Sequence, residues 1–247
     1  MTGGPETARR LGALLFRYRS YIPPLLLVIL AAALWADRDG RPGPGLEGRF
    51  LGLGLVPIAL GFLIRAAVVG TAPRGTSGRS TLEQVAESLN TTGLYSVIRH
   101  PLYLGNFFLW VGLAITTGVW WAPPAIALAF VLFYRPIVAT EEAFLARAFG
   151  EEFTRWAAAT PCYWPNLRRW RPSRLPFRVK IVLRQEYYGF FIVVLFLVVL
   201  EAVASITFGA GWRLDPPWLI ALGAATLIAG LLRWLQRNTS FLDVEGR

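Results

Sequence analysis

Long apolar segments separated by arginine-bearing polar stretches constrain this chain more than any other feature of its sequence. Six such segments come close to the about 20 residues that an α-helix needs to cross the hydrocarbon core of a bilayer. The chain is 55% hydrophobic with a mean hydropathy of +0.47, whereas soluble domains average about 45–50% apolar residues. We therefore predict an all-α, polytopic membrane bundle of about six transmembrane helices.

The predicted spans cover residues 21–36, 50–70, 102–119, 121–139, 187–208 and 218–235. They divide the chain into residues 1–88 with the first two membrane helices, a central core over 89–167, and residues 168–247 with a basic segment and the last two helices. Leu34 and Trp35 interrupt the small-residue pattern of a cleavage site, so the first span is expected to be a retained helix and not a signal peptide. Ser80 as N-cap and Glu83 as its capping-box partner predict a short surface helix over 81–89.

The positive charges predict the orientation of the chain. The net charge is +10, and the predicted spans place nineteen arginine and lysine residues on one side and four on the other. Since basic loops stay in the cytoplasm, we expect a multi-pass protein of a bacterial inner membrane with both termini cytoplasmic. The arginines flank apolar segments, which favours lipid headgroups over nucleic acid as their partner. The basic run over 168–180 fits either simple anchoring or a surface that gathers anionic headgroups.

Several polar residues lie inside or beside the predicted spans. Arg65 stands near the end of the second span, where its side chain can reach the interface. Glu201 lies inside the fifth span and must face protein or water. It is either a partner for Arg65 or part of a substrate pocket. The glycines of the second span are expected to be helix-packing positions; they include Gly52, Gly54 and Gly61.

The strongest candidate for a functional site combines Arg99 and His100 with Glu141 and Glu142. His100 is the only histidine, and it precedes Pro101 at the start of the third span. All four residues are predicted on the cytoplasmic side. Ionisable side chains held against lipid cost free energy, and proteins keep them there mainly where they have a function. These four residues therefore indicate a functional site.

The two glutamates are predicted to open a helix after the fourth span. Its apolar positions recur every three or four residues, which defines one buried face; they are Leu145, Phe149, Phe153 and Trp156. Glu142 shares that face, whereas Glu141 lies about 100° away. We therefore expect Glu142 to bind inward and Glu141 to brace the helix, for instance on an arginine. The plainer interpretations are acids that cap a helix N-terminus and an interfacial belt of Arg, His and Tyr.

Cysteine and histidine usage argues against a metal protein. One cysteine, Cys162, excludes an internal disulfide, and one cysteine with one histidine does not build a zinc site. Cys162 lies in an aromatic loop over 161–165 and is expected to be structural. The sequence therefore predicts no metal ligand.

Three stretches in this order resemble the isoprenylcysteine carboxyl methyltransferases and the related phospholipid N-methyltransferases, which are integral-membrane enzymes. They are Thr91-Thr92-Gly93-Leu94-Tyr95, Arg99-His100-Pro101-Leu102-Tyr103-Leu104-Gly105, and Glu141-Glu142 with Leu145 and Phe149-Gly150. The resemblance covers about residues 89–167 and implies S-adenosylmethionine as cofactor. It implies binding of that cofactor by the following residues: Arg99, His100, Pro101, Tyr103, Leu104, Gly105, Glu141 and Glu142.

Within this resemblance, each residue type suits a part of the cofactor. An inward Glu142 pairs with the amino group, and His100 holds the carboxylate or the ribose. Tyr103 and Leu104 pack against the adenine, and Gly105 lets the cofactor approach the helix backbone. The transfer itself depends mainly on positioning, with Glu142, Arg99 and Arg155 expected to be the catalytic residues.

The acceptor is predicted from a departure from the family pattern. Prenylcysteine enzymes place basic residues before the proline that follows the Glu-Glu helix, but this chain has Ala157-Ala158-Ala159-Thr160 before Pro161. The cation that would hold a substrate carboxylate is missing at this place, and Arg155 or Arg168 is the nearby residue that could replace it. Trp156 replaces a second tyrosine and suits an amine through cation–π attraction. We therefore expect a membrane-embedded lipid acceptor such as a phospholipid amine, with a prenylcysteine carboxylate or a thiol as the alternative. A non-catalytic scaffold or lipid-binding protein is the alternative of another class.

Overall fold

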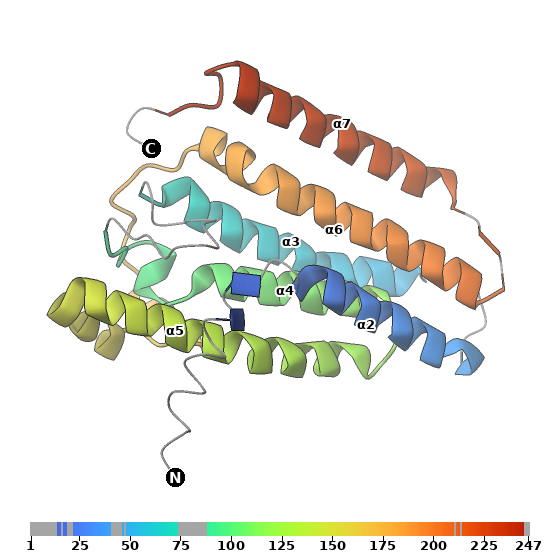
Figure 1. The fold of residues 1–247 in the computed structure, drawn as a ribbon, viewed down its shortest axis with the longest axis horizontal. Coiled ribbons are helices and arrows are strands. Elements are labelled where there is room, and N and C mark those ends of the chain that lie inside the picture. Colours follow the sequence, from blue (N-terminus) through green and yellow to red (C-terminus); the bar gives the residue numbers. More distant parts are fainter. Residues whose placement is uncertain are drawn as a thin grey trace, which may run out of the picture.

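The protein forms a bundle of long helices in a computed structural model (Figure 1). The structure describes residues 14–15, 17–18, 22–40, 46, 48–73, 88–209, 211–212 and 214–244. The long helices are α2 Ile22–Ala36, α3 Gly48–Thr71, α4 Pro101–Thr116, α5 Ala122–Ala159, α6 Val179–Thr207 and α7 Pro216–Asn238. Across these ranges the chain forms no strand and a single isolated β-bridge, between Gly93 and Arg171. The predicted all-α class is confirmed.

Four of the helices are long and apolar enough to cross a membrane, namely α3, α5, α6 and α7. The helices α2 and α4 are apolar but shorter, with 15 and 16 residues. Large apolar side chains cover the outside of the bundle, and α7 buries Ala225 alone. The chain is therefore an integral-membrane helical bundle, as predicted.

Glycines bring α3 and α4 into close contact. A Cβ on Gly54 would lie 2.6 Å from the Gly112 carbonyl oxygen, and one on Gly61 would lie 2.7 Å from the Gly105 carbonyl oxygen. These two positions confirm the predicted packing role, since only glycine lets two helix backbones approach so closely. For Gly52 the prediction is wrong, because its Cβ would meet nothing within 4 Å.

Helix α5 differs most from the sequence-based prediction. It continues past residue 139 without a break, so Glu141 and Glu142 lie inside the helix and do not open a new one. The capping interpretation of these acids is therefore wrong. Residues 137–149 contain neither glycine nor proline, and the helix is interrupted only at Gly150, with φ 52° and ψ −122°. Residues 151–159 form a second helical piece after this kink.

Other boundaries shifted as well. Helix α6 begins at Val179, eight residues before the predicted start, because the polar residues that precede the apolar run, such as Lys180 and Arg184, are good helix formers. Helix α4 ends at Thr116, before the predicted 119. Most of the predicted surface helix over 81–89 lies outside the described residues, which resume at residue 88. Residues 88–89 are not helical.

The segments that flank α4 and α5 are joined by backbone hydrogen bonds at one end of the bundle. The Arg99 amide donates to the Pro161 carbonyl (3.0 Å), the Asn166 amide to Val97 (2.9 Å), and the Gly93 amide to Arg171 (2.9 Å). These bonds hold the segment that leads into α4, which contains the short 3-10 helix Leu94–Ser96, against the loop that leaves α5 (Figure 1). They bring the first turn of α4 next to the middle of α5.

Candidate functional site

The site is built around the imidazole of His100, which is buried. Glu142 Oε1 lies 2.9 Å from His100 Nε2, and Glu142 Oε2 accepts from Arg99 Nη1 at 3.3 Å. On the other edge of the ring, Glu141 Oε2 lies 3.8 Å from Nδ1 and accepts from the Tyr103 hydroxyl at 2.8 Å. The two halves of the predicted constellation therefore meet, and each carboxylate faces one nitrogen of the same imidazole.

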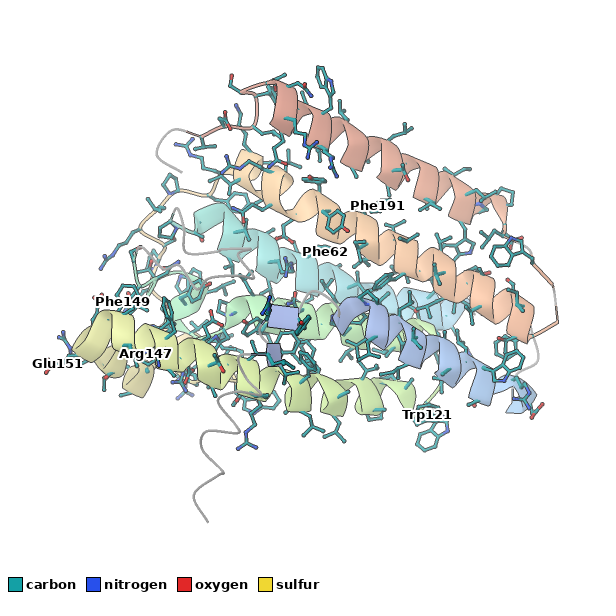
Figure 2. The ribbon with its side chains drawn as sticks, in the orientation of Figure 1. Phe62, Trp121, Arg147, Phe149, Glu151 and Phe191 are labelled. Atoms are coloured by element: carbon teal, nitrogen blue, oxygen red, sulfur yellow. The ribbon has the colours of Figure 1, made fainter. Side chains whose placement is uncertain are left out.

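Local sequence explains this arrangement. His100 is the N-cap of α4, and Pro101 follows at the first helical position. Proline fits there because the backbone N–H that it lacks would have no partner within the helix. Tyr103 stands three residues after His100, and the two rings stack with centroids 5.6 Å apart. Phe149 and Glu151 lie farther along α5, beside the Gly150 kink (Figure 2).

The arginine contact falls on the other carboxylate than expected. An arginine was the example given of a brace for Glu141, but Arg99 contacts Glu142. Because Arg99 and His100 are adjacent and precede the same helix start, both side chains reach the same carboxylate. Glu141 is the more exposed of the two, with 33% of its side chain accessible against 22% for Glu142.

One donor in the cluster has no partner. Arg99 Nε is buried and makes no hydrogen bond within the described residues. A buried donor without a partner is rare in proteins. Arg99 Nε is therefore free, among the described residues, to donate to a further acceptor at the site.

The remaining predicted residues lie as follows. Pro101 is buried at the start of α4, and Leu104 is half-buried in its first turn. A Cβ on Gly105 would lie 2.6 Å from Arg65 Cγ and 3.1 Å from the Gly61 carbonyl oxygen. Gly105 therefore makes room for α3, and its role in admitting a cofactor stays a prediction. Arg155 is exposed, and its Nε donates to the carbonyl of Glu151 at 3.4 Å in its own helix, so the structure does not bring it to the cluster.

Cys162, for which a structural role was predicted, also contacts the cluster. Its Sγ lies 3.6 Å from Glu142 Oε1. Burial raises the pKa of the Cys162 thiol, and the negative charge of Glu142 raises it further. Nothing in the local sequence reveals this contact, because it depends on the bond between the Arg99 amide and the Pro161 carbonyl.

A second polar group lies deeper in the bundle. Arg65 Nε and Nη2 donate to Glu186 Oε2 and Oε1 at 2.7 and 2.9 Å, and Nη1 donates to Asn106. Glu201 instead accepts from the amide of Leu46 at 2.7 Å. The alternative in which Glu201 pairs with Arg65 is therefore wrong, as is the expectation that Arg65 reaches out to the interface.

Tyr134 connects the deeper group to the site. The Asn106 side-chain amide lies 3.5 Å from the Tyr134 hydroxyl. The ring of Tyr134 packs on Tyr103 with centroids 4.9 Å apart, and Tyr103 in turn donates to Glu141. A chain of polar and aromatic contacts thus runs from α6 to the site.

Comparison with known proteins adds the family. A family described as phospholipid methyltransferase matches residues 50–152. A cobalt-zinc-cadmium resistance protein of Cupriavidus metallidurans is 32% identical over 166 residues, which cover 66% of this chain and 71% of that protein. A nickel-cobalt-cadmium resistance protein of Alcaligenes xylosoxydans xylosoxydans is 41% identical over 95 residues, or 38% of this chain and 42% of that protein.

The protein-S-isoprenylcysteine O-methyltransferase of Schizosaccharomyces pombe is 30% identical over 110 residues, or 42% of this chain and 46% of that enzyme. The chain thus spans less than half the length of the last two relatives. No solved structure matches it. The matched residues contain both halves of the cluster around His100, and the chain belongs to the family of integral-membrane methyltransferases that includes the phospholipid and isoprenylcysteine methyltransferases.

Proposed function

We propose that this protein transfers a methyl group from S-adenosylmethionine to a lipid-like acceptor dissolved in the membrane. The observation that carries the proposal is the unpartnered Arg99 Nε, buried beside two carboxylates that flank one histidine. This mixture of one free cationic donor and two acids matches a ligand that carries both a carboxylate and an amino group.

The residues fit such a cofactor in the following way. Arg99 binds the carboxylate through its free Nε, and Glu141, the more exposed acid, binds the amino group. Glu142 keeps Arg99 and His100 in place, since it contacts both. Tyr103 and Leu104 offer apolar surface beside them. The cofactor supplies an activated methyl group on a sulfonium, and the chain holds it in line with the acceptor, for which positioning is the main catalytic effect.

The acceptor is proposed to be a lipid, since the site lies between the start of α4 and the middle of α5 in an integral-membrane bundle. Two classes remain. The family match names phospholipid methyltransferases, which favours an amine headgroup. Several relatives are named isoprenylcysteine O-methyltransferases, which favours a carboxylate on a prenyl thioether. Trp156 no longer argues for the amine, because its indole N–H donates to the Tyr95 carbonyl at 3.0 Å and its ring packs on Phe153.

We further propose that the site faces the cytoplasm of a bacterium, where a soluble cofactor is available. The arginine-rich segments before α4 and after α5 are joined at the same end of the bundle as the site. Basic segments remain on the cytoplasmic side during insertion.

The test is binding of S-adenosylhomocysteine to the detergent-purified protein by calorimetry. Saturable binding is expected in the wild type and in Arg155→Ala, whose side chain is exposed outside the cluster. His100→Ala is expected to lose it while retaining its helical circular dichroism. Equal binding in both variants would contradict the assignment. A folded wild type that does not bind would favour a scaffold or lipid-binding role.

A further inference from the structure

The contacts of Cys162 complete a set of three different ligand atoms at the site. His100 Nε2, Glu142 Oε1 and Cys162 Sγ all lie within 4.8 Å of one another, with 2.9 Å from nitrogen to oxygen and 3.6 Å from sulfur to oxygen. They come from the start of α4, the middle of α5 and the loop that follows it. In a tetrahedral zinc site with bonds of about 2.0–2.3 Å, neighbouring ligand atoms lie about 3.3–3.5 Å apart. The two separations from Glu142 Oε1 lie within about 0.5 Å of that range, and the third pair of atoms is no more than 4.8 Å apart.

The surroundings of His100 resemble those of a metal-binding histidine. Such a histidine coordinates through one ring nitrogen and donates the N–H of the other to a group that orients the ring, and Glu141 lies on that side, beyond hydrogen-bond distance. Here Glu141 Oε2 lies 3.8 Å from Nδ1, and the Tyr103 hydroxyl donates to the same oxygen. This arrangement leaves Nε2 directed at Glu142 and Cys162.

The charges around the three ligands would be balanced by a divalent cation. Glu141, Glu142 and a Cys162 thiolate carry three negative charges, and Arg99 at 3.3 Å from Glu142 carries one positive charge. A bound ion of charge two neutralises the remainder. Nitrogen and sulfur ligands select zinc and cadmium over magnesium and calcium, which prefer oxygen.

We propose that His100, Glu142 and Cys162 bind one Zn²⁺ or Cd²⁺ ion, and that this ion excludes the methyl-donor cofactor from the same site. The exclusion rests on the proposed function, because the ion draws Glu142 away from Arg99, the residue that binds the cofactor carboxylate there. Binding moves the thiol proton of Cys162 to water and leaves the His100 proton on Nδ1, opposite Glu141. The ion then replaces the contact between His100 and Glu142 with bonds to both.

The first arm of the test measures metal binding alone. The full-length protein in detergent is titrated with Cd²⁺, and binding is followed by calorimetry and by the ultraviolet absorption of a cadmium–thiolate bond. One ion per chain is expected, with no response to Mg²⁺. Cys162 is the only cysteine, so Cys162→Ala must abolish the cadmium–thiolate absorption. It is also expected to weaken Cd²⁺ binding by more than about 100-fold, because loss of a group that only orients a metal ligand costs up to about 100-fold in affinity.

A matched control separates the cluster from a thiol that merely attracts metal. The double variant Cys162→Ala/Trp164→Cys moves the thiol by two residues to a position that is 85% exposed. It is expected to bind Cd²⁺ as weakly as Cys162→Ala does. Wild-type affinity in either variant, or no binding in a folded wild type, would overturn the inference.

The second arm measures S-adenosylhomocysteine binding with and without saturating Cd²⁺. The apparent affinity is expected to fall at least about tenfold in the wild type and to be insensitive to Cd²⁺ in Cys162→Ala. An unchanged affinity in the wild type would overturn the competition. If S-adenosylhomocysteine does not bind at all but Cd²⁺ still binds through Cys162, the proposed function fails and the metal site stands.

Discussion

At the scale of single residues, the site depends on what surrounds His100. Its two ring nitrogens face different carboxylates, and its ring stacks on Tyr103. Arg99 supports one carboxylate and keeps one donor unpaired. Sequence spacing was enough to predict that these residues meet, but not which glutamate contacts the arginine, because that depends on side-chain directions on two different helices.

Cys162 reports on this environment through its reactivity. Burial and the charge of Glu142 raise the pKa of its thiol, and only the thiolate reacts with alkylating reagents. In metal-free protein, alkylation by iodoacetamide is therefore expected to rise at a higher pH than for a free cysteine, whose pKa is about 8.5. A change of one unit in this pKa alters the rate at a fixed lower pH by about tenfold.

The Glu142→Gln variant tests the cause of this pKa shift. Removal of the negative charge lowers the pKa of Cys162, so the rate profile is expected to move to lower pH. Glu152→Gln, an exposed acid on the same helix, serves as the control and leaves the profile in place. A wild-type profile at or below that of free cysteine would refute the expectation.

At the scale of elements, apolar runs predicted the existence of every long helix but not its ends. The predicted break at residue 139 came from a change in polarity, yet a helix follows backbone hydrogen bonding and is interrupted only where a residue disrupts it. In α5 that residue is Gly150, which adopts a positive φ, and the second helical piece runs on to Ala159. For the same reason α6 starts among polar residues at Val179. Polarity marks where a helix leaves the membrane, and not where it stops.

Two glycines in α3 provide a matched test of helix packing. A Cβ on Gly54 would lie 2.4 Å from Thr116 Cγ2 and 2.6 Å from the Gly112 carbonyl oxygen, whereas one on Gly52 would meet nothing. Gly54→Ala is expected to destabilise the protein by about 1–3 kcal/mol through overpacking. Gly52→Ala is expected to be neutral or to stabilise it by up to about 1 kcal/mol through helix propensity.

The comparison is made by thermal unfolding in one detergent, followed by circular dichroism. Only the difference between the two variants matters, because both add the same methyl group to the same helix. Equal unfolding temperatures would show that α3 and α4 separate easily at this contact. A larger effect for Gly52→Ala would mean that the opposite face of α3 is the packed one.

At the scale of the whole molecule, the site lies where two distant parts of the chain are joined by backbone bonds between residues 93–99 and 161–171. The arginine distribution indicated that these segments share one side of the membrane, and the structure places them at the same end of the bundle (Figure 1). What the sequence did not reveal is how α6 takes part. Glu186 lies before the predicted span and gave no signal of its own, since its partner Arg65 is 121 residues away.

The pair between Arg65 and Glu186 joins α3 to α6, where Phe62 and Phe190 also pack with ring centroids 5.7 Å apart; Figure 2 shows Phe62 between these helices. The exposed fractions of the Arg65 and Glu186 side chains are 19% and 10%. Removal of one member leaves the other charge buried without compensation, which costs about 3–5 kcal/mol. Arg65→Met is therefore expected to lower the unfolding temperature strongly. The double variant Arg65→Met/Glu186→Met removes both charges and is expected to recover most of the loss.

The pair between Arg184 and Asp243 provides the contrast. Its closest atoms are 3.6 Å apart and the Asp243 side chain is 70% exposed, so solvent screens the interaction and Arg184→Met is expected to change stability by about 0–1 kcal/mol. Thermal unfolding of the four proteins in one detergent measures these differences. If the double variant is as unstable as Arg65→Met, the uncompensated charge of Glu186 is not the cause of the loss, and the expectation is wrong. Recovery in the double variant shows instead that the loss in Arg65→Met comes from the buried Glu186 carboxylate left without its partner.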